Sequence, residues 1–546
     1  MLALTAALIG TGCTPGAEPG GGQTGAAPTP AGPVATDGAS ATASPPGSPA
    51  ATPPSSPAAP PGGGAQLAWT ACGGGFECST LRVPRDHERP DDGDVSLAVV
   101  RLPATDSGKR VGSLVVNPGG PGGSGVRYAR AAERVITANV RNRFDIVGFD
   151  PRGVAMSEPV DCLSDAELDT FLAIDGSPDT ARERKRLVTE AREFAAGCGR
   201  RSGQLLPHLS TADAARDMDV LREALGEERL TYLGKSYGTL LGATYAELFP
   251  RRVGRLVLDG AIDPTLSGGE IGVAQAEGFE GALRAFVQDC QALEDCPLRG
   301  GPTADVESGV DQVADLLAEV DRAPLPGGGD RELTQSLALL GVVAALYDEA
   351  NGWPVLRLAL GRAFDGDGSV LLTLADFYTE RQRDGSYTSN QNEATYAVTC
   401  LDRAEPTDVD AYAADARDFA RRSPLFGAYV AWSTLPCASW PAPPASRPHP
   451  IRAPGAAPIL VVGTVRDPAT PYVWAQSLAE QLESGVLLSY DGDGHTAYAR
   501  GSACIDDAVE RYLIDGEVPP ADTVCEPSGP GGDEVALGPL AVAARR

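Results

Sequence analysis

Residues 234–238 read Gly-Lys-Ser-Tyr-Gly, a pattern that can place Ser236 as a nucleophile on a sharp turn. The apolar run Leu230–Leu233 precedes the pattern, and a helical stretch, residues 239–249, follows it. Strand, tight turn and helix are the context in which such a serine projects above a sheet. The pattern predicts acyl transfer through Ser236, although a chain with 65 glycines can also form an ordinary turn of this sequence.

A serine nucleophile needs a base, and the chain has four histidines that can supply one: His87, His208, His449 and His495. His87 lies in a charged turn ahead of the expected core strands, His208 precedes the helix that leads to Ser236, and His449 lies among prolines. His495 lies in a glycine-flanked loop just after an expected strand, where α/β enzymes place their reactive groups. We therefore expect His495 to be the general base.

The orienting acid of an α/β hydrolase lies between the serine and the histidine in chain order. Asp467 fits this order, because the apolar run Ile459–Val462 leads into the loop that carries it. An aspartate there would accept the imidazole N–H and stabilise the imidazolium ion. Asp491 and Asp493 are the alternatives, but both lie too close to His495 along the chain to reach its ring easily.

A glycine-rich loop, residues 117–125, follows the expected strand Ser113–Val116 and reads Asn-Pro-Gly-Gly-Pro-Gly-Gly-Ser-Gly. Glycines let the main chain approach a substrate closely, so that amide groups can point at a developing oxyanion. We expect the amides of Gly120 and Tyr237 to be the two donors. The spacing fits neither a dinucleotide-binding motif nor a P-loop, and a flexible loop without a chemical role is the alternative.

The composition limits the classes of protein to which the chain can belong. The chain has 546 residues, 42% of them hydrophobic, and a formal net charge of −28, which fits a soluble extracellular protein and argues against nucleic-acid binding. Eleven cysteines without a Cys-x-x-Cys pair, in a chain poor in histidine, indicate disulfides rather than a metal site, and we expect no cofactor. Spacing alone cannot determine connectivity, but neighbours along the chain suggest Cys72–Cys78, Cys162–Cys198, Cys290–Cys296, Cys400–Cys437 and Cys504–Cys525.

The N-terminal part indicates export. Residues 1–13 are similar to a lipoprotein signal that ends at Cys13, the expected lipidation site, although a basic region is missing and a plain secretion signal is the alternative. The apolar stretch is too short to span a membrane, so membrane contact would occur only through a lipid on Cys13. Residues 14–65 are mostly Gly, Pro, Ala, Ser and Thr and are expected to be a disordered linker. The expected location is the cell surface, or otherwise the extracellular medium.

From residue 66 onwards the patterns predict an α/β fold, a mostly parallel sheet with helices on both faces. We expect a core in two parts, residues 66–264 and 441–530, a mainly helical cap over residues 265–440, and a tail over residues 531–546. One expected core helix begins with Thr211 as N-cap and ends at Gly226. The expected strands are Ser113–Val116, Phe144–Phe149, Leu230–Leu233, Arg255–Leu258, Ile459–Val462 and Val486–Tyr490.

Five segments together resemble the secreted tripeptidyl aminopeptidases of actinomycetes, α/β hydrolases related to prolyl aminopeptidases. The resemblance extends over about residues 66–530 and is carried by residues 117–125, 150–153, 234–239, 466–471 and 494–496. It implies an α/β-hydrolase fold with a helical cap, export often as a lipoprotein, triad roles for Ser236, Asp467 and His495, and an oxyanion role for Gly120. Arg152 is expected to be structural and to bond near the oxyanion loop.

The implied reaction is removal of a short peptide, or of one residue, from a peptide with a free N-terminus. The substrate ammonium group then needs an anionic partner, and Glu270, Glu393 and Asp402 of the cap are candidates among which the sequence does not choose. An esterase or lipase-type carboxylic ester hydrolase is the alternative on the same fold. A non-catalytic peptide-binding lipoprotein is a third possibility, against which the complete triad argues.

Overall fold

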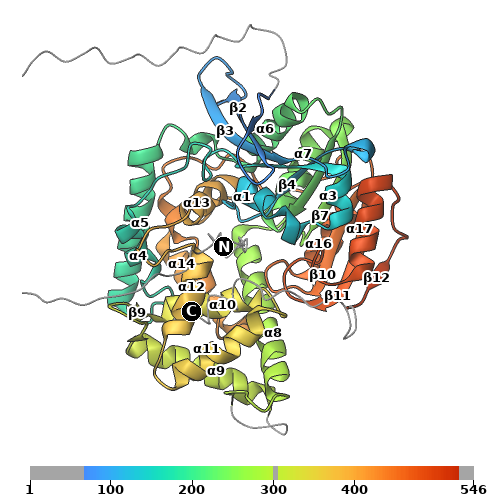
Figure 1. Ribbon diagram of the computed structural model, residues 1–546. Helices are drawn as coiled ribbons and strands as arrows, with labels where there is room; N and C mark the ends of the chain where they lie inside the picture. The colour runs from blue at the N-terminus through green and yellow to red at the C-terminus, as the bar shows by residue number, and fades with distance from the viewer. Residues whose placement is uncertain (1–66, 299–304, 528–546) are drawn as a thin grey trace, which may run out of the picture. The chain divides into compact units, whose positions relative to one another are not determined.

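The computed structural model describes residues 67–298 and 305–527, which belong to one compact unit (Figure 1). The expectations for residues 1–13 with Cys13, for the linker 14–65 and for the tail 531–546 lie outside the described residues. Within the described ranges, no helix is both long and apolar enough to cross a membrane.

The core is a ten-stranded sheet. Three of its strands, β1, β2 and β3, run antiparallel to their neighbours, and the other seven, β5, β4, β6, β7, β10, β11 and β12, run parallel to one another. All six expected strands are present and thus confirmed. In spatial order the strands are β1 (Thr70–Ala71), β2 (Glu77–Pro84), β3 (Asp94–Leu102), β5 (Phe144–Phe149), β4 (Gly112–Asn117), β6 (Leu230–Lys235), β7 (Val253–Asp259), β10 (Ile459–Arg466), β11 (Gly485–Asp493) and β12 (Thr523–Cys525).

Strands β2 and β3 were not expected from the sequence. Their residues alternate between buried and exposed positions, so neither strand forms a continuous apolar run. His87 therefore lies in the turn between two core strands, and the expectation that it precedes the core strands was wrong.

Helices cover both faces of the sheet. Along β4, Val115 packs with the helices of one face, whereas Leu114 and Val116 pack with those of the other, as the alternation of side chains along a strand requires. One face carries α6 (Thr211–Ala224), α7 (Tyr237–Leu248) and α16 (Tyr472–Gln481). The other carries α1 (Gly125–Arg130), α3 (Ala138–Arg143) and α17 (Ala503–Asp515), with the short α2 (Ala132–Val135) between α1 and α3.

The sequence predicts Thr211 as the N-cap of α6, but the N-cap is Ser210, so this prediction was wrong. The Ser210 hydroxyl accepts a hydrogen bond from the Asp213 amide at 3.2 Å, which satisfies one of the free amides of the first turn. Thr211 is the first helical residue, and its hydroxyl is free to bond elsewhere. Gly226, at a φ of +77°, follows the end of the helix.

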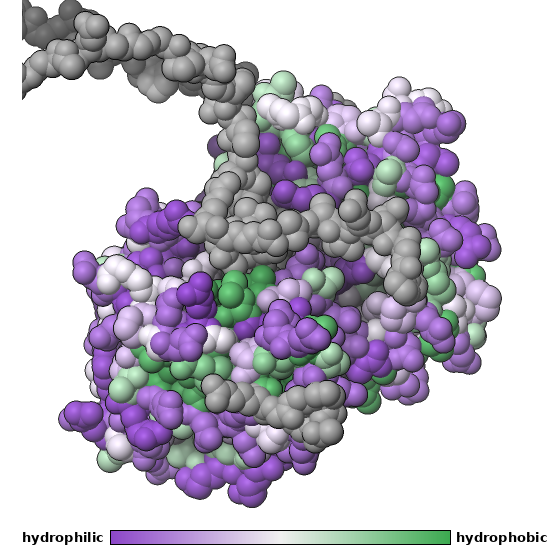
Figure 2. All heavy atoms as spheres, turned by 60° about the horizontal axis from the view of Figure 1, so that its bottom comes forward, coloured by the Kyte–Doolittle hydropathy of each residue, from purple (hydrophilic) through white to green (hydrophobic). Residues whose placement is uncertain are grey.

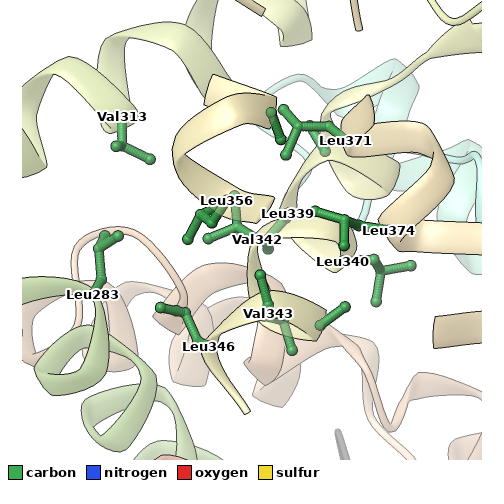
Figure 3. Close-up of a cluster of buried hydrophobic side chains, with 14 of the residues drawn as sticks. Leu283, Val313, Leu339, Leu340, Val342, Val343, Leu346, Leu356, Leu371 and Leu374 are labelled. Carbon is green, nitrogen blue, oxygen red and sulfur yellow. The ribbon is translucent and has the colours of Figure 1, made fainter. Parts of the chain in front are cut away.

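Between β7 and β10 the regular elements of the described residues are almost all helices. Helix α10 is buried at nearly every position and forms the centre of this cap (Figure 3). The only strands described there are the two-residue β8 (Leu325–Pro326) and β9 (Glu332–Leu333). The cap helices are α8 (Gly268–Gln291), α9 (Val306–Arg322), α10 (Gln335–Leu346), α11 (Gly352–Phe364), α12 (Ser369–Thr379), α13 (Gln391–Asp402), α14 (Val409–Arg422), α15 (Gly427–Trp432) and the 3-10 helix η5 (Leu435–Ser439).

A second segment contributes to the cap layer. Helices α4 (Asp165–Leu172) and α5 (Ala181–Ser202) follow β5 in the chain but pack with residues of α13, α14 and η5 (Figure 1). Seen from the cap side, the described surface is mostly hydrophilic with a few separate hydrophobic patches (Figure 2). The five expected disulfides are all present, and three of them, Cys162–Cys198, Cys290–Cys296 and Cys400–Cys437, lie in this layer.

Helix α11 offers a matched test of the cap core. Leu356 is fully buried in the cluster of Figure 3, whereas Leu358 on the same helix is 43% exposed. Leu356→Ala is expected to lower the free energy of unfolding by about 2–5 kcal/mol, because it removes buried methyl groups and leaves a cavity. Leu358→Ala should change it by about 0.5 kcal/mol at most. Equal losses in urea unfolding would contradict this packing.

Candidate active site

Ser236 lies at the junction of β6 and α7 with φ 55° and ψ −124°, a backbone conformation that residues with a side chain rarely adopt. Two flanking glycines permit the bend. A Cβ atom on Gly234 would lie 2.3 Å from the carbonyl oxygen of Gly238, and one on Gly238 would lie 2.9 Å from Oδ1 of Asn117. The structure therefore contains the strained strand–turn–helix junction that the sequence pattern predicts.

His495 and Asp467 form a directly bonded pair. Nδ1 of His495 lies 2.9 Å and 3.0 Å from the two carboxylate oxygens of Asp467. The carboxylate also accepts the amides of Ala469, Thr470 and Thr496 at 2.9, 2.8 and 3.1 Å. With Nδ1 as donor to this anchored carboxylate, Nε2 is the ring nitrogen that can take up a proton.

Nε2 of His495 is buried and has no hydrogen-bond partner among the described residues. The main chain after β7 brings the imidazole and the serine to the same sheet edge: the Ser236 amide donates to the Asp259 carbonyl at 2.9 Å, and a Cβ on Gly260 would lie 3.3 Å from Cε1 of His495. Buried polar atoms are normally hydrogen-bonded, so an unpaired Nε2 is unusual. It leaves this nitrogen available to accept a proton.

The other histidines have different partners. Nε2 of His87 lies 2.8 Å from Asp217, and Nε2 of His449 lies 2.9 Å from Glu247. His208 ends the 3-10 helix η2 (Leu206–His208) before α6. Of the four histidines, only His495 has a carboxylate partner at the carboxyl ends of the parallel strands.

The two alternative acids are both held by Arg466. The guanidinium donates to Asp491 at 2.7 Å and to Asp493 at 2.9 Å. The carboxylate that bonds His495 is that of Asp467, so Asp467 is the acid that contacts the imidazole.

The glycine-rich loop touches the serine turn. A Cβ on Gly119, at φ 101°, would lie 2.9 Å from Cβ of Ser236 and 3.1 Å from the Tyr237 amide nitrogen. Tyr237 is the first residue of α7, so its amide has no carbonyl within the helix to bond. The amides of Gly120 and Tyr237 thus lie on segments that meet beside Ser236.

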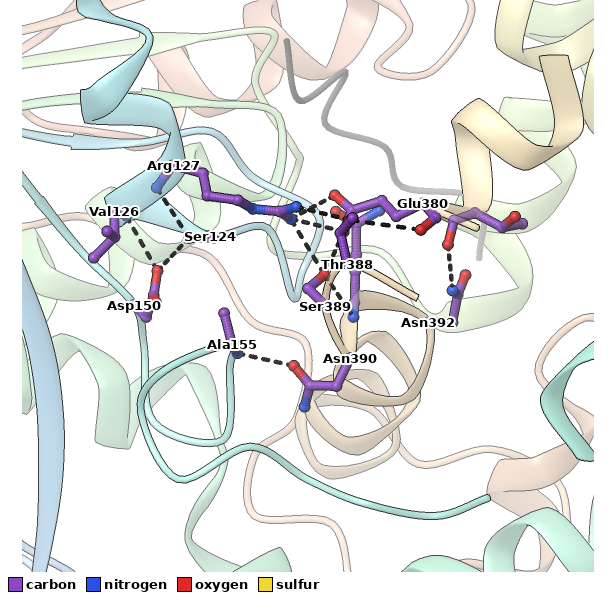
Figure 4. A network of polar contacts seen from close by, with 12 residues as sticks. Ser124, Val126, Arg127, Asp150, Ala155, Glu380, Thr388, Ser389, Asn390 and Asn392 are labelled. Carbon is purple, nitrogen blue, oxygen red and sulfur yellow. Dashed lines mark hydrogen bonds and ion pairs between the residues drawn. The ribbon is translucent and has the colours of Figure 1, made fainter. Parts of the chain in front are cut away.

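Asp150, just after β5, holds the end of this loop (Figure 4). Its carboxylate accepts the Ser124 hydroxyl at 2.5 Å and the amides of Val126 and Met156 at 3.1 Å each. Burial raises the pKa of Asp150. This role of Asp150 is not predicted from the sequence, although Asp150 opens the Asp-Pro-Arg-Gly segment, one of the five that carry the family resemblance.

Arg152 is structural, but its bonds differ from those expected. Its guanidinium is buried, pairs with Asp217 at 2.6 Å and donates to the carbonyls of Pro84, Arg85 and His208. It therefore joins the end of β2 to α6 and does not bond the oxyanion loop, which Asp150 holds instead.

The cap closes over both halves of the site. A Cβ on Gly122 would lie 2.8 Å from the Gln391 carbonyl of α13, so only glycine permits this approach. The His495 amide donates to the Tyr347 carbonyl of the cap at 3.0 Å, and the two rings meet edge to face at 5.2 Å. Ser236, Asp467 and His495 are 2%, 3% and 6% exposed, so substrate must pass the cap to reach them.

A partly buried ion pair also joins the cap to the helix that follows the glycine loop (Figure 4). Arg127 of α1 contacts both carboxylate oxygens of Glu380 at 2.5 and 2.7 Å, and the hydroxyls of Thr388 and Ser389 donate to the same carboxylate. This pair attaches the cap beside the oxyanion loop.

The three carboxylates predicted to bind a substrate amine lie in different places. Glu270 is exposed and caps its own helix through Ser267. Glu393 accepts the amides of Cys162 and Leu163 at 2.8 and 2.9 Å, and Asp402 is bonded to Thr211. None of the three contacts a triad residue among the described bonds, and these contacts favour structural roles.

Asp402 is connected through Thr211 to Tyr237, the residue after the nucleophile. Its carboxylate accepts the amide of Thr211 at 2.8 Å and also the Thr211 hydroxyl, which lies 2.6 Å from the Tyr237 hydroxyl. Burial raises the pKa of Asp402 to about 6. The cap thus holds the side chain of Tyr237 through one threonine.

Thr211→Val keeps the side-chain shape and removes the hydroxyl that connects Asp402 to Tyr237. We expect kcat to fall about tenfold with little change in KM, because a displaced Tyr237 amide would stabilise an oxyanion less well. Steady-state kinetics with a chromogenic substrate measures this, with Thr170→Val on the exposed face of α4 as control. A Thr211→Val enzyme as fast as the control would contradict the connection.

Glu393 gives a pH-dependent prediction. Burial raises its pKa from 4.5 to about 7, so between these values the folded state holds a proton more tightly than the unfolded chain. The free energy of unfolding should therefore fall as the pH rises from about 5 to 7. Glu393→Gln, which cannot ionise, should show a smaller fall in urea unfolding at the two pH values. An identical fall in both proteins would contradict the assignment.

Comparison with known proteins places the chain among enzymes. A family model described as TAP-like protein matches residues 423–525, the segment that carries Asp467 and His495. The serine protease Hip1 of Mycobacterium tuberculosis is 40% identical over 480 residues, covering 85% of this chain and 91% of that protein. Carboxylesterase B of the same organism is 37% identical over 82% of this chain and 86% of that protein. The tripeptidyl aminopeptidase of Streptomyces lividans is 34% identical over 85% of this chain and 87% of that protein.

Proposed function

The chain belongs to the α/β-hydrolase family that includes Hip1 and the Streptomyces tripeptidyl aminopeptidases, and on this basis we propose that it is a serine exopeptidase. It removes short peptides or single residues from peptides with a free N-terminus. The observation that supports this most strongly is the buried pair of Asp467 and His495, with Nε2 free at the sheet edge where the Ser236 turn lies.

In the proposed reaction, Oγ of Ser236 attacks the scissile carbonyl carbon while Nε2 of His495 takes its proton. Asp467 holds the ring and stabilises the imidazolium ion. The amides of Gly120 and Tyr237 bind the carbonyl oxygen as it becomes negative. His495 then gives the proton to the leaving amine, which leaves an acyl group on Ser236, and water activated by the same histidine releases it.

The exopeptidase part of the proposal draws support from the cap and from two relatives. All three triad residues are buried and the cap contacts the loops beside them, and a covered site suits the end of a chain better than its middle. Of the similar proteins, Hip1 is a serine protease and the Streptomyces enzyme is a tripeptidyl aminopeptidase. The free N-terminus of the substrate would need an acidic partner, which we expect on the cap.

An ester hydrolase is the second candidate, because carboxylesterase B matches nearly as much of the chain. The same triad can cleave both amides and esters, so the site alone does not separate the two reactions.

We also propose that the enzyme works outside the cytoplasm, with Cys13 as a lipid anchor or with the chain released. Five disulfides joining ten cysteines support an oxidising compartment.

A substrate panel tests the activity. Tripeptidyl, prolyl and alanyl anilides with free N-termini should be cleaved at least about tenfold faster than their N-acetylated forms, since acetylation removes the ammonium group and its ion pair. Short-chain p-nitrophenyl esters belong in the same panel, and Ser236→Ala is the control that should abolish every activity. Equal rates on free and blocked anilides would exclude the aminopeptidase, and turnover of esters alone would favour the esterase.

A further inference from the structure

Two charged side chains beside the triad have no part in the reaction described above. Asp259, the last residue of β7, is fully buried, and Lys235, the last residue of β6, directly precedes Ser236. Burying ionised groups costs free energy unless they are paired and hydrogen-bonded. We therefore examine what these two side chains bond at the edge of the sheet.

Asp259 contacts both the nucleophile and the segment that carries the base. Its main-chain carbonyl accepts the Ser236 amide at 2.9 Å. Its carboxylate accepts the amides of Ala497 at 2.9 Å and Tyr498 at 3.0 Å, two and three residues after His495. One residue thus connects the serine turn with the histidine loop.

Lys235 makes the same connection from the neighbouring strand. Its Nζ lies 3.5 Å from Oδ2 of Asp259 and donates to the carbonyl of Tyr498 at 2.7 Å and to the hydroxyl of Thr496 at 3.4 Å. Burial lowers the pKa of Lys235, and the Asp259 carboxylate opposes that change. Both partners of the ion pair therefore bond the loop that carries His495.

The histidine loop needs such support because it leaves the sheet. β11 ends at Asp493, and Thr496 has a φ of +68°, so the loop bends sharply directly after His495. Three consecutive amides, those of Thr496, Ala497 and Tyr498, donate to carboxylates: the first to Asp467 and the other two to Asp259. Hydrogen bonds to charged groups are stronger than those between neutral groups, and three of them in a row favour one conformation of this short loop.

We propose that Asp259 and Lys235 form a buried ion pair that positions the loop of His495 against Ser236. Asp259 is a positioning residue and not the acid of the triad, because its carboxylate bonds main-chain amides, whereas Asp467 bonds the imidazole. The inference rests on the proposed role of Ser236 and His495, but it does not depend on whether the substrate is a peptide or an ester.

The test measures how fast a fluorophosphonate probe labels Ser236. In that reaction Oγ of Ser236 bonds to phosphorus, fluoride leaves, and His495 takes the hydroxyl proton, so the rate reports the geometry of serine and base without a peptide substrate. Wild-type protein that is not labelled would contradict the proposed function itself. Labelled wild-type protein allows the positioning role to be tested separately.

Asp259→Asn is expected to lower the maximal labelling rate constant about 10- to 100-fold, with little change in the probe concentration for half-maximal rate, because a small displacement of the base slows proton transfer. The matched control is Asp491→Asn, an exposed aspartate four residues before His495 that pairs with Arg466. Its labelling rate should equal that of the wild type.

The rate constant separates positioning from simple loss of folded protein. If Asp259 were only structural, Asp259→Asn would reduce the fraction of molecules that label, while the folded remainder labelled at the wild-type rate, and that result would overturn the proposal. Should Asp259→Asn yield too little folded protein, Lys235→Met serves in its place with the same expected fall. The double variant Asp259→Asn with Lys235→Met should label faster than Asp259→Asn alone, since no buried charge is left unpaired.

Discussion

Ser236 has a positive φ of 55° at the end of β6, and the main chain can pack around this bend only because glycine occupies the contact positions. A side chain on Gly119 would collide with the serine itself, and one on Gly234 would collide with the first turn of α7. The oxyanion loop, the nucleophile and the histidine loop can therefore meet at one edge of the parallel sheet. A larger residue at either position would separate them, whatever the rest of the fold contributed.

Buried carboxylates hold the loops of this edge in place. Asp150 bonds the end of the glycine loop, Asp467 bonds the imidazole and the turn after β10, and Asp259 bonds the chain beyond His495. Each accepts two or more main-chain or hydroxyl donors, so the buried carboxylate oxygens are hydrogen-bonded and hold the loops in place. These three carboxylates share a position at the end of a strand of the sheet: Asp259 is the last residue of β7, and Asp150 and Asp467 directly follow β5 and β10.

Much of the site could be predicted because it depends on chain order and residue scarcity. Four histidines, one of them after a strand, and an aspartate between serine and histidine were sufficient to identify the Asp467–His495 pair. Neighbouring cysteines were sufficient for all five disulfides. The missed features depend on contacts between distant segments: nothing local distinguishes Ser210 from Thr211 as a cap, since the decisive partner of Thr211 is Asp402. Asp259 likewise resembles any aspartate at the end of a strand until the loop around it is seen.

A crystal structure of the protein after reaction with a peptidyl phosphonate would test the proposed active site. We expect a phosphorus bonded to Oγ of Ser236, a phosphoryl oxygen within hydrogen-bond distance of the Gly120 and Tyr237 amides, and His495 still bonded to Asp467 with Nε2 facing the adduct. A phosphoryl oxygen that points away from both amides, or an adduct on another residue, would contradict it.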